Sequence, residues 1–219
     1  MNNEFDNNNN EDNAESLNDN MAVKSKFTDT ILDWIESFFF AVFVVILIFT
    51  FILRTVVVVG DSMNPNFEGA RPYSEDYSGA DRLIITHLLS TPEKGDVLVM
   101  NCHGLNETII KRCIGTEGDN VKIDYNTNKI YVNGKEISND YINGPMEDKY
   151  NFNQSYKTGD GIYEYKVPED KVFVMGDNRN NSSDSREAAV GFIDEDDILG
   201  TVIFRIYPFD KVGKIGNML

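Results

Sequence analysis

The stretch FFFAVFVVILIFTFIL, from Phe38 to Leu53, decides whether the chain is a soluble or a membrane-anchored protein. Its sixteen residues carry no charge, and extension back to Trp34 provides the ~20 apolar residues that a membrane span needs. A core helix of a soluble protein would show a polar face, which this run lacks. A cleaved signal peptide would start nearer the N-terminus and end in small residues, whereas Arg-Thr-Val-Val-Val-Val follows here. The pattern therefore predicts an uncleaved transmembrane anchor over residues 31–54.

Net negative charge is present on both sides of this anchor. The 219 residues include 36 acidic and 20 basic side chains, which give a net charge of −16. The Asn-rich N-terminal part contributes −4, the start of the anchor −3 and the remainder −9. Residues 1–30 are predicted to be a disordered acidic tail, since they offer almost nothing apolar to bury. Nucleic acid is excluded as the main partner, because phosphate binding requires a dense basic surface.

The lysines that precede the span indicate its orientation. Lys24 and Lys26 lie before the apolar run, and Arg54 follows it. Because cytoplasmic flanks are enriched in Lys and Arg, this pattern favours a cytoplasmic N-terminus with the C-terminal body on the extracytoplasmic face. The expected location is the cell membrane, crossed once.

The C-terminal body has the pattern of an antiparallel β domain. Short apolar or β-branched runs recur between turn signals such as Asn126-Thr127-Asn128 and Asn133-Gly134. Helical periodicity is nearly absent, with one short candidate at 194–199. Residues 55–219 are therefore predicted to form a mainly β domain, with an inserted β-rich segment at about 119–172. The expected strands are Thr55–Val59, Arg82–Thr86, Asp96–Asn101, Thr108–Ile114, Val121–Asp124, Lys129–Val132, Tyr163–Val167, Lys171–Met175 and Gly200–Tyr207.

The two cysteines lie at successive strands joined by a loop around Gly104-Leu105. A hairpin centred between these two residues places Cys113 opposite Asp96, and one centred on Leu105 places it opposite Val97. Neither register pairs Cys113 with Cys102, so two free cysteines are favoured over a disulfide.

The chain contains only two histidines, His87 and His103. Neither lies near a Gly-rich or Ser-containing turn, which argues against a Ser-His-Asp hydrolase. Cys102 and His103 are adjacent, a spacing that does not suit a metal site. No phosphate-binding loop or dinucleotide motif is present, so no metal or cofactor is expected.

Three segments of the body stand out chemically. Val59–Pro65 holds Ser62, Ile109–Gly115 holds Lys111 within an apolar strand, and Met175–Arg186 is rich in Asp, Asn, Ser and Arg. Taken singly, each has an ordinary explanation: a turn, an edge lysine that protects a sheet, and a polar loop.

In combination these segments closely resemble type I signal peptidases, membrane-anchored serine proteases that remove signal peptides. The family pattern has an anchor followed by G-x-S-M-x-P, then D-R-L, R/K-G-D-hydrophobic, I-K-R-hydrophobic-I-G and G-D-N-R-x-N-S-x-D-S-R. The matching segments here are Gly60–Pro65, Asp81–Leu83, Lys94–Val97, Ile110–Gly115 and Gly176–Arg186, in that order. The resemblance covers residues 38 to about 215.

The resemblance implies a Ser/Lys dyad, with Ser62 as nucleophile and Lys111 as general base. A serine hydroxyl needs a base to take its proton, and a lysine can do so only when it is neutral. The reference pKa of ~10.4 must therefore fall by several units, which desolvation can supply. Ile109, Ile110 and Ile114 flank Lys111, and Arg112 is expected on the opposite face of the strand.

Supporting residues also follow from the resemblance. Ser182 would hydrogen-bond and orient the lysine, while Asp184 and Arg186, with Asp177 upstream, would brace the active-site loop. A surface ion pair of little energetic value is the alternative for Asp184 and Arg186. The oxyanion hole would use the backbone N–H of Ser62.

Substrate binding is expected along the strands before Ser62 and Lys111, where an extended signal-peptide end would add as a further strand. Signal peptides end in an A-x-A-like pattern, so the pockets should be shallow and apolar. Position matching suggests Val58, Met63, Ile109 and Val174, with core packing as the alternative for all four. The expected partners are preprotein signal peptides, the lipid bilayer and, indirectly, the export translocon.

The chain departs from the family pattern in its loops. Asn66 stands where Thr is usual, and the segments at 67–80 and 187–190 are longer than usual. Two other functions fit this sequence less well. Self-cleaving Ser/Lys repressors carry a DNA-binding domain where this chain has an anchor, and a catalytically weak, membrane-anchored binding domain for exported chains would not need Ser62, Lys111 and Ser182 together.

Overall fold

The computed structural model describes residues 30–50, 52–87, 91–142, 144–149 and 151–215. The chain divides into two compact units, residues 1–51 and 52–219. Within the first, Thr30–Thr50 form one helix of 21 residues, apolar and long enough to cross a membrane. At 1.5 Å per residue it measures about 31 Å, close to the ~30 Å hydrocarbon core of a bilayer.

The helix boundaries differ from the predicted anchor at its C-terminal end. The helix ends at Thr50, whereas Leu53 and Arg54, which were predicted to belong to the anchor, lie in strand β1 (Leu53–Val57). Pairing with β2 (Arg82–Thr86) explains the difference, because Leu53 lies opposite Thr86 and Arg54 opposite Ile85. The predicted tail falls outside the described residues, apart from Thr30.

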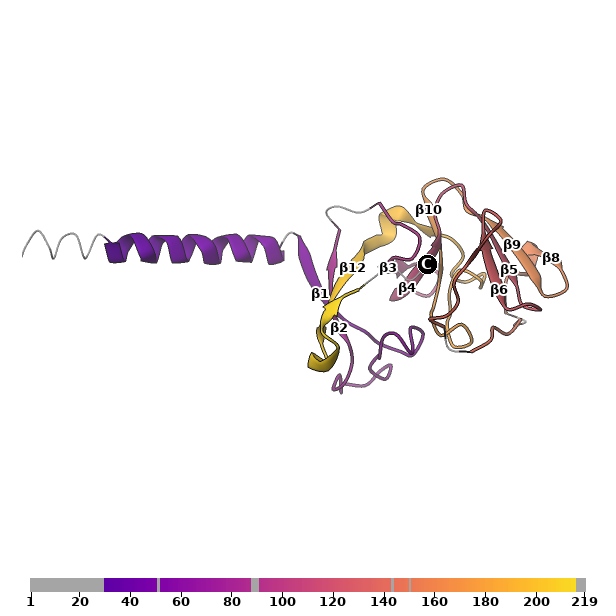
Figure 1. Cartoon of the computed structure of the whole chain (residues 1–219), viewed down its shortest axis with the longest axis horizontal. Helices are drawn as coiled ribbons and strands as arrows, with labels where there is room; N and C mark the ends of the chain where they lie inside the picture. The colour runs from indigo at the N-terminus through magenta and orange to yellow at the C-terminus, as the bar shows by residue number, and fades with distance from the viewer. Residues whose placement is uncertain (1–29, 51, 88–90, 143, 150, 216–219) are drawn as a thin grey trace, which may run out of the picture. The chain divides into compact units, whose positions relative to one another are not determined.

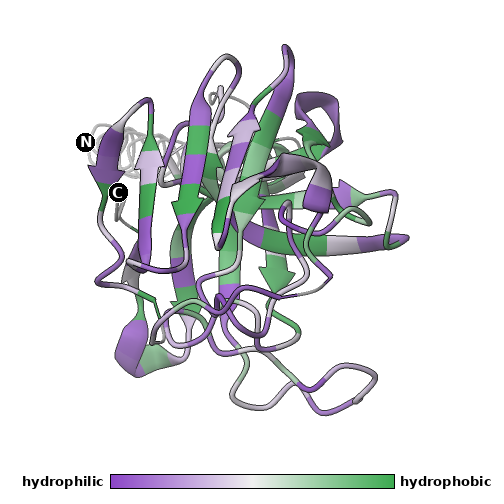
Figure 2. Cartoon of the chain, turned by 90° about the vertical axis from the view of Figure 1, so that its right-hand side faces the viewer, coloured by the Kyte–Doolittle hydropathy of each residue, from purple (hydrophilic) through white to green (hydrophobic). Residues whose placement is uncertain are grey.

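The larger of two sheets in the second unit has eight antiparallel strands in the order β1-β2-β12-β3-β4-β10-β11, with β13 paired to β12 (Figure 1). Its remaining members are β3 (Val97–Cys102), β4 (Glu107–Gly115), β10 (Lys171–Met175), β11 (Ile193–Asp194), β12 (Ile198–Tyr207) and β13 (Gly213–Lys214). Apolar and polar bands alternate along many of these strands (Figure 2), as expected for a sheet with one face in a core.

The smaller sheet has five strands in the order β7-β6-β5-β9-β8 and occupies residues 120–166, between β4 and β10 in the chain. This range lies inside the segment predicted as an inserted β-rich part. Its strands are β5 (Asn120–Asp124), β6 (Lys129–Val132), β7 (Lys135–Ile137), β8 (Lys157–Gly159) and β9 (Ile162–Lys166).

The prediction of a mainly β, antiparallel domain is confirmed, and every predicted strand is present to within two residues at each end. The short helix predicted at 194–199 is wrong. Only Glu195–Asp197 form a 3-10 turn, η2, because β11 ends at Asp194 and β12 begins at Ile198. The described residues contain two further 3-10 turns, η1 (Gln154–Tyr156) and η3 (Phe209–Lys211).

The hairpin of β3 and β4 adopts the first of the two predicted registers. Val97 pairs with Arg112, and Cys113 donates its N–H to the carbonyl of Asp96, 2.8 Å away. Cys102 lies opposite Glu107, so the two cysteines do not face each other, and both are free and buried.

Strand β4 is the element that positions the site. It pairs with β3 from Glu107 to Arg112, and with β10 only from Arg112 to Gly115. The edge of Glu107–Lys111 that faces away from β3 therefore has no strand partner among the described residues. An antiparallel strand with one open edge can accept a further extended chain.

Candidate active site

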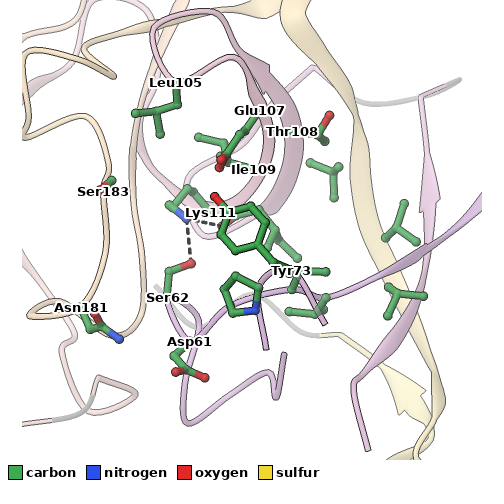
Figure 3. Close-up of a pocket in the computed structure, with 18 residues that line it drawn as sticks. Asp61, Ser62, Tyr73, Leu105, Glu107, Thr108, Ile109, Lys111, Asn181 and Ser183 are labelled. Atoms are coloured by element: carbon green, nitrogen blue, oxygen red, sulfur yellow. Dashed lines mark hydrogen bonds between the residues drawn. The ribbon is translucent and has the colours of Figure 1, made fainter. Parts of the chain in front are cut away.

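Ser62 and Lys111 meet in this structure. Lys111 Nζ lies 2.8 Å from Ser62 Oγ and 2.9 Å from the carbonyl oxygen of Ile110, and donates a hydrogen bond to each (Figure 3). The two residues come from segments 49 positions apart, the loop after β1 and strand β4. A nucleophile and a base in direct contact are the geometry that covalent catalysis requires.

The surroundings of Lys111 lower its pKa. The side chain is buried, with 4% of its surface exposed, and this burial lowers the pKa to about 8 against the opposing influence of Asp184, Cys102 and Asp177. No carboxylate forms an ion pair with Lys111 in the described structure. The amine can therefore be neutral at mildly alkaline pH, as a general base must be.

The loop that carries Ser62 is held by the polar segment after β10. Asn178 donates its backbone N–H to the Ser62 carbonyl, at 2.9 Å, and its side-chain amide to the Asp61 carbonyl, at 3.0 Å. At Gly176 a Cβ atom would lie 2.5 Å from the Ser62 carbonyl oxygen and 2.3 Å from Ser182 Oγ. Only glycine permits this close approach, which places Ser182 beside the loop that carries Ser62.

A buried ion pair connects the two halves of the site. Arg112 binds Asp177 in bidentate geometry, with N···O distances of 2.8 and 2.6 Å, and both side chains are fully buried. Asp177 also accepts a hydrogen bond of 2.9 Å from Asn66, four residues after Ser62. The guanidinium of Arg112 lies 4.8 Å from the centroid of the Tyr141 ring. One carboxylate thus links the strand of Lys111 to the loop of Ser62.

Asp184 and Arg186 form a second buried pair, which removes the alternative of a weak surface pair. Arg186 donates to both carboxylate oxygens of Asp184, at 2.7 and 2.9 Å, and to the carbonyl of Arg179. Asp184 accepts the backbone N–H of Gly176 at 3.0 Å. Burial alone would raise the pKa of Asp184, but the charge and hydrogen bonds of Arg186 lower it. The pair fixes the segment that holds Ser62.

Ser182 differs from its expected arrangement. Its Oγ is buried and forms no hydrogen bond with Lys111, so the expected contact is not made in this structure; the hydroxyl instead contributes to lowering the pKa of Asp184. Lys111 instead uses the carbonyl of its neighbour Ile110, together with Ser62 Oγ. The orienting role of Ser182 remains a prediction.

A cleft of about 940 Å³ opens over the Ser62–Lys111 pair. Its buried members are Val58, Val99, Ile109, Ile110 and Lys111, and its exposed rim includes Pro72, Tyr73, Glu107, Thr108, Asn181 and Ser183. The floor is thus apolar except for the lysine. Such a lining suits small apolar side chains.

Two of the four predicted pocket residues lie elsewhere. Val58 and Ile109 line the cleft, whereas Met63 and Val174 are fully buried and do not. Met63 packs in the core cluster of Leu83, and Val174 packs in that of Leu98. Core packing, the alternative interpretation, describes these two side chains in this structure.

The wall of the cleft opposite β4 also offers free backbone groups. Ala70 donates to the Val58 carbonyl and accepts from the Gly60 N–H, at 3.0 and 2.8 Å. Because an extended chain directs successive backbone groups to opposite sides, the N–H and C=O of Val59 point away from Ala70. The cleft therefore lies between two extended segments that can each hydrogen-bond a further chain.

Sequence reasoning overlooked several residues that hold the site together. The sequence predicts Arg112 on the strand face opposite Lys111 but not its pairing with Asp177, and it predicts none of the contacts of Asn66 and Asn178. The one available signal was the density of Asp, Asn, Ser and Arg between Met175 and Arg186, which predicted a hydrogen-bonded scaffold but not its partners.

Comparison with known proteins agrees with the resemblance. The family model described as signal peptidase, peptidase S26, matches residues 31–207. Signal peptidase I of Bacillus amyloliquefaciens is 33% identical over 194 residues, which cover 87% of this chain and 96% of the relative. Signal peptidase IB of Staphylococcus aureus strain COL is 33% identical over 195 residues, covering 83% and 92%. A solved signal peptidase I from Enterococcus faecalis V583 aligns at 25% identity with a TM-score of 0.40, over 52% of this chain and 97% of that one.

Proposed function

The chain belongs to the signal peptidase family, peptidase S26, and from this premise we propose that it is a membrane-bound serine endopeptidase that removes signal peptides from exported preproteins with a Ser62–Lys111 dyad. The observation that carries the proposal is the 2.8 Å contact between Lys111 Nζ and Ser62 Oγ, made by a lysine whose burial lowers its pKa to about 8. A general base must contact the nucleophile that it deprotonates, and its pKa must lie near the pH at which the enzyme works.

The chemistry is acyl transfer in two steps. Neutral Lys111 takes the proton of Ser62 as Oγ attacks the scissile carbonyl carbon, and the resulting ammonium gives that proton to the departing amine when the C–N bond breaks. Water then attacks the acyl-enzyme, with Lys111 again as base, and releases the signal peptide and Ser62. The buried ion pairs around the dyad take no part in proton transfer and hold the two reacting groups in place.

The developing oxyanion would be bound by the backbone N–H of Ser62. That group makes no hydrogen bond within the described part of the chain, so it remains available to a substrate. Gly60, two residues earlier, has a φ of +82° and carries no side chain, so no hydroxyl supplements the main-chain donor at this position. A single donor of this kind contributes about 10²- to 10³-fold to the rate.

The substrate would lie as an extended strand between Val59 and the open edge of β4. Its backbone can hydrogen-bond both walls, while the small residues of an A-x-A pattern point to the floor formed by Val58 and Ile109. Val58 and Ile109 are buried to 2% and 8% exposure, so the floor that they form is apolar. An apolar floor suits the small apolar residues of an A-x-A pattern.

The apolar helix supports a role at the membrane. We propose that Thr30–Thr50 cross the bilayer once, with the N-terminus in the cytoplasm and the catalytic body on the extracytoplasmic face. Signal peptides are themselves inserted in the membrane, and anchoring the enzyme raises its effective concentration toward them. Lipid would thus be a direct partner, and the export translocon an indirect one.

The proposal is tested with detergent-solubilised full-length chain and a fluorescent peptide that contains Ala-x-Ala. We expect Ser62→Ala and Lys111→Ala each to abolish cleavage while near-ultraviolet circular dichroism stays native. Ser183→Ala is the matched control, because Ser183 is an exposed serine of the same cleft and should retain activity. Cleavage by either dyad variant at the wild-type rate would overturn the dyad. Binding without cleavage by the wild type would favour a binding domain instead.

A further inference from the structure

The loop at 67–80, which the family pattern does not account for, is fastened to the catalytic segment at its base. Asp81 donates its N–H to the Glu68 carbonyl at 2.8 Å, and Glu68 donates its own N–H to the Asp81 carboxylate at 3.2 Å. A Cβ at Gly69 would lie 2.0 Å from the Gly60 carbonyl oxygen, so only glycine allows this packing. The loop is therefore positioned relative to Ser62 by main-chain contacts.

Beyond this base the loop is held by its own turns. Ser74 donates its N–H to the Arg71 carbonyl at 3.2 Å, and Asp76 donates its N–H to the Ser74 hydroxyl at 3.0 Å. Ser78 then donates to the Asp76 carboxylate at 2.9 Å, which lowers the pKa of Asp76. Asx and Ser turns of this kind give a polar loop a defined backbone.

Tyr73 stands out in this loop. Its side chain is 99% exposed, its φ is +61°, and it lines the cleft together with Pro72, near Ser62 and Lys111 (Figure 3). A non-glycine residue in the left-handed region costs conformational energy, and such outliers cluster at functional sites. An aromatic ring held in water beside a catalytic pair has no packing partner until a substrate arrives.

The position of Tyr73 selects which substrate side chains it can meet. In an extended peptide successive side chains point in opposite directions. If the two small residues of A-x-A point to the buried floor at Val58 and Ile109, the middle residue points away from the floor, toward the exposed rim that contains Tyr73. This argument rests on the substrate orientation given under the proposed function.

We infer that Tyr73 is a specificity-determining residue that packs on the middle side chain of the A-x-A segment and favours large apolar residues there. A ring that is fully exposed in the free enzyme gains apolar contact only with a side chain of sufficient size, and contacts of this kind change affinity about fivefold. A serine at the middle position would leave the ring in water and gain nothing from it.

The test pairs two enzymes with two substrates, otherwise identical peptides with Ala-Leu-Ala or Ala-Ser-Ala before the scissile bond. We expect Tyr73→Ala in the full-length chain to lower kcat/KM for the Leu peptide about fivefold, mainly through KM, and to leave the Ser peptide within about twofold. Tyr73→Phe, which keeps the ring, should retain the wild-type preference for Leu.

Tyr77→Ala is the matched control, since Tyr77 belongs to the same loop, is exposed and does not line the cleft. It should leave both peptides unchanged. An equal loss for both peptides in Tyr73→Ala, or an unchanged Leu-to-Ser ratio, would overturn the inference. Ser62→Ala is run beside them, because cleavage that survives in that variant refutes the dyad and not the role of Tyr73.

Discussion

Lys111 and Arg112 are neighbours on β4, both nearly inaccessible to water, yet their surroundings are opposite. Within the described residues, Lys111 hydrogen-bonds a hydroxyl and a carbonyl alone, and its pKa falls to about 8. Arg112 on the other face forms a bidentate pair with Asp177 and donates a third bond to the Gly95 carbonyl. Because successive side chains of a strand point to opposite faces, a single residue step separates a reactive cation from a structural one.

The difference shows how a rigid strand serves two purposes at once. A buried charge without a counter-ion destabilises the fold, and a buried pair is costly mainly when one partner is lost. Lys111 keeps the energetic cost of a buried charge without a counter-ion. This cost lowers its pKa, so the amine loses its proton more readily. The arginine face compensates by fixing β4 to the loop of Ser62 through Asp177 and Asn66. The following predictions test whether the two faces are as separate as this geometry indicates.

Removal of Asp177, the counter-ion of Arg112, should have the largest effect on the stability of the fold. Asp177→Ala leaves Arg112 buried without its carboxylate, and such a loss costs about 3–5 kcal/mol of unfolding free energy. Urea unfolding in detergent, followed by near-ultraviolet circular dichroism, measures it through the buried tyrosines Tyr163 and Tyr165. Tryptophan fluorescence would not report on the body, because Trp34 lies in the apolar helix. A loss below about 1 kcal/mol would mean that water or another group compensates Arg112.

Replacement of Lys111, on the other face of β4, should change the stability of the fold with the opposite sign. Lys111→Met should abolish cleavage, since it removes the proposed base, but it should stabilise the fold at pH 7, because it also removes a buried ammonium group. The pKa of Lys111 is lowered from 10.5 to about 8, so the unfolded chain binds the proton more tightly and the gain is up to about 3 kcal/mol.

The pH dependence of that gain supplies the control. Wild-type stability from this group should rise as pH increases from about 8 to 10.5, so the advantage of Lys111→Met should shrink over this window. An advantage that is constant with pH would indicate better packing of methionine and not the cost of a buried charge.

The sequence predicted the longer strands better than the short ones. Runs with clear apolar alternation, such as Arg82–Thr86 and Lys171–Met175, were found with correct ends. The strands β7, β8, β11 and β13 were missed, since each has two or three residues and exists only through its partner. Asn133-Gly134 was recognised as a turn, with φ values of +53° and +80°, but β7 after it is too short to show a pattern.

In the site, the sequence likewise predicted individual side chains better than their long-range hydrogen-bond partners. Ser62 and Lys111 were identified from local motifs, whereas Asn66, 111 positions before Asp177, has no local signal for that contact. Ser182 shows the converse case, in which a motif position predicted a hydrogen bond that this structure does not contain. Long-range polar partners depend on tertiary packing, which a one-dimensional pattern does not encode.

The activity profile should follow the protonation of Lys111. Because the neutral amine is the proposed base, kcat/KM should rise with pH to a plateau above about 8, and should fall about tenfold per unit below it. At pH 6 the loss is about a hundredfold. A peptide without ionisable side chains near the scissile bond isolates this group. A flat profile between pH 6 and 8 would contradict a lysine base with this pKa.

Arg112→Lys should have the smallest effect and tests the separation of the two faces most directly. Lysine keeps the charge opposite Asp177 but loses the bidentate geometry, which should cost about 1–2 kcal/mol of unfolding free energy. Among the charges that act on the pKa of Lys111 are Asp184, Asp177 and Arg186, and Arg112→Lys leaves all three in place. The midpoint of the pH profile should therefore stay at the wild-type value. A shift of about one unit would show that the two faces of β4 are electrostatically coupled, and that Arg112 helps to keep the catalytic amine neutral.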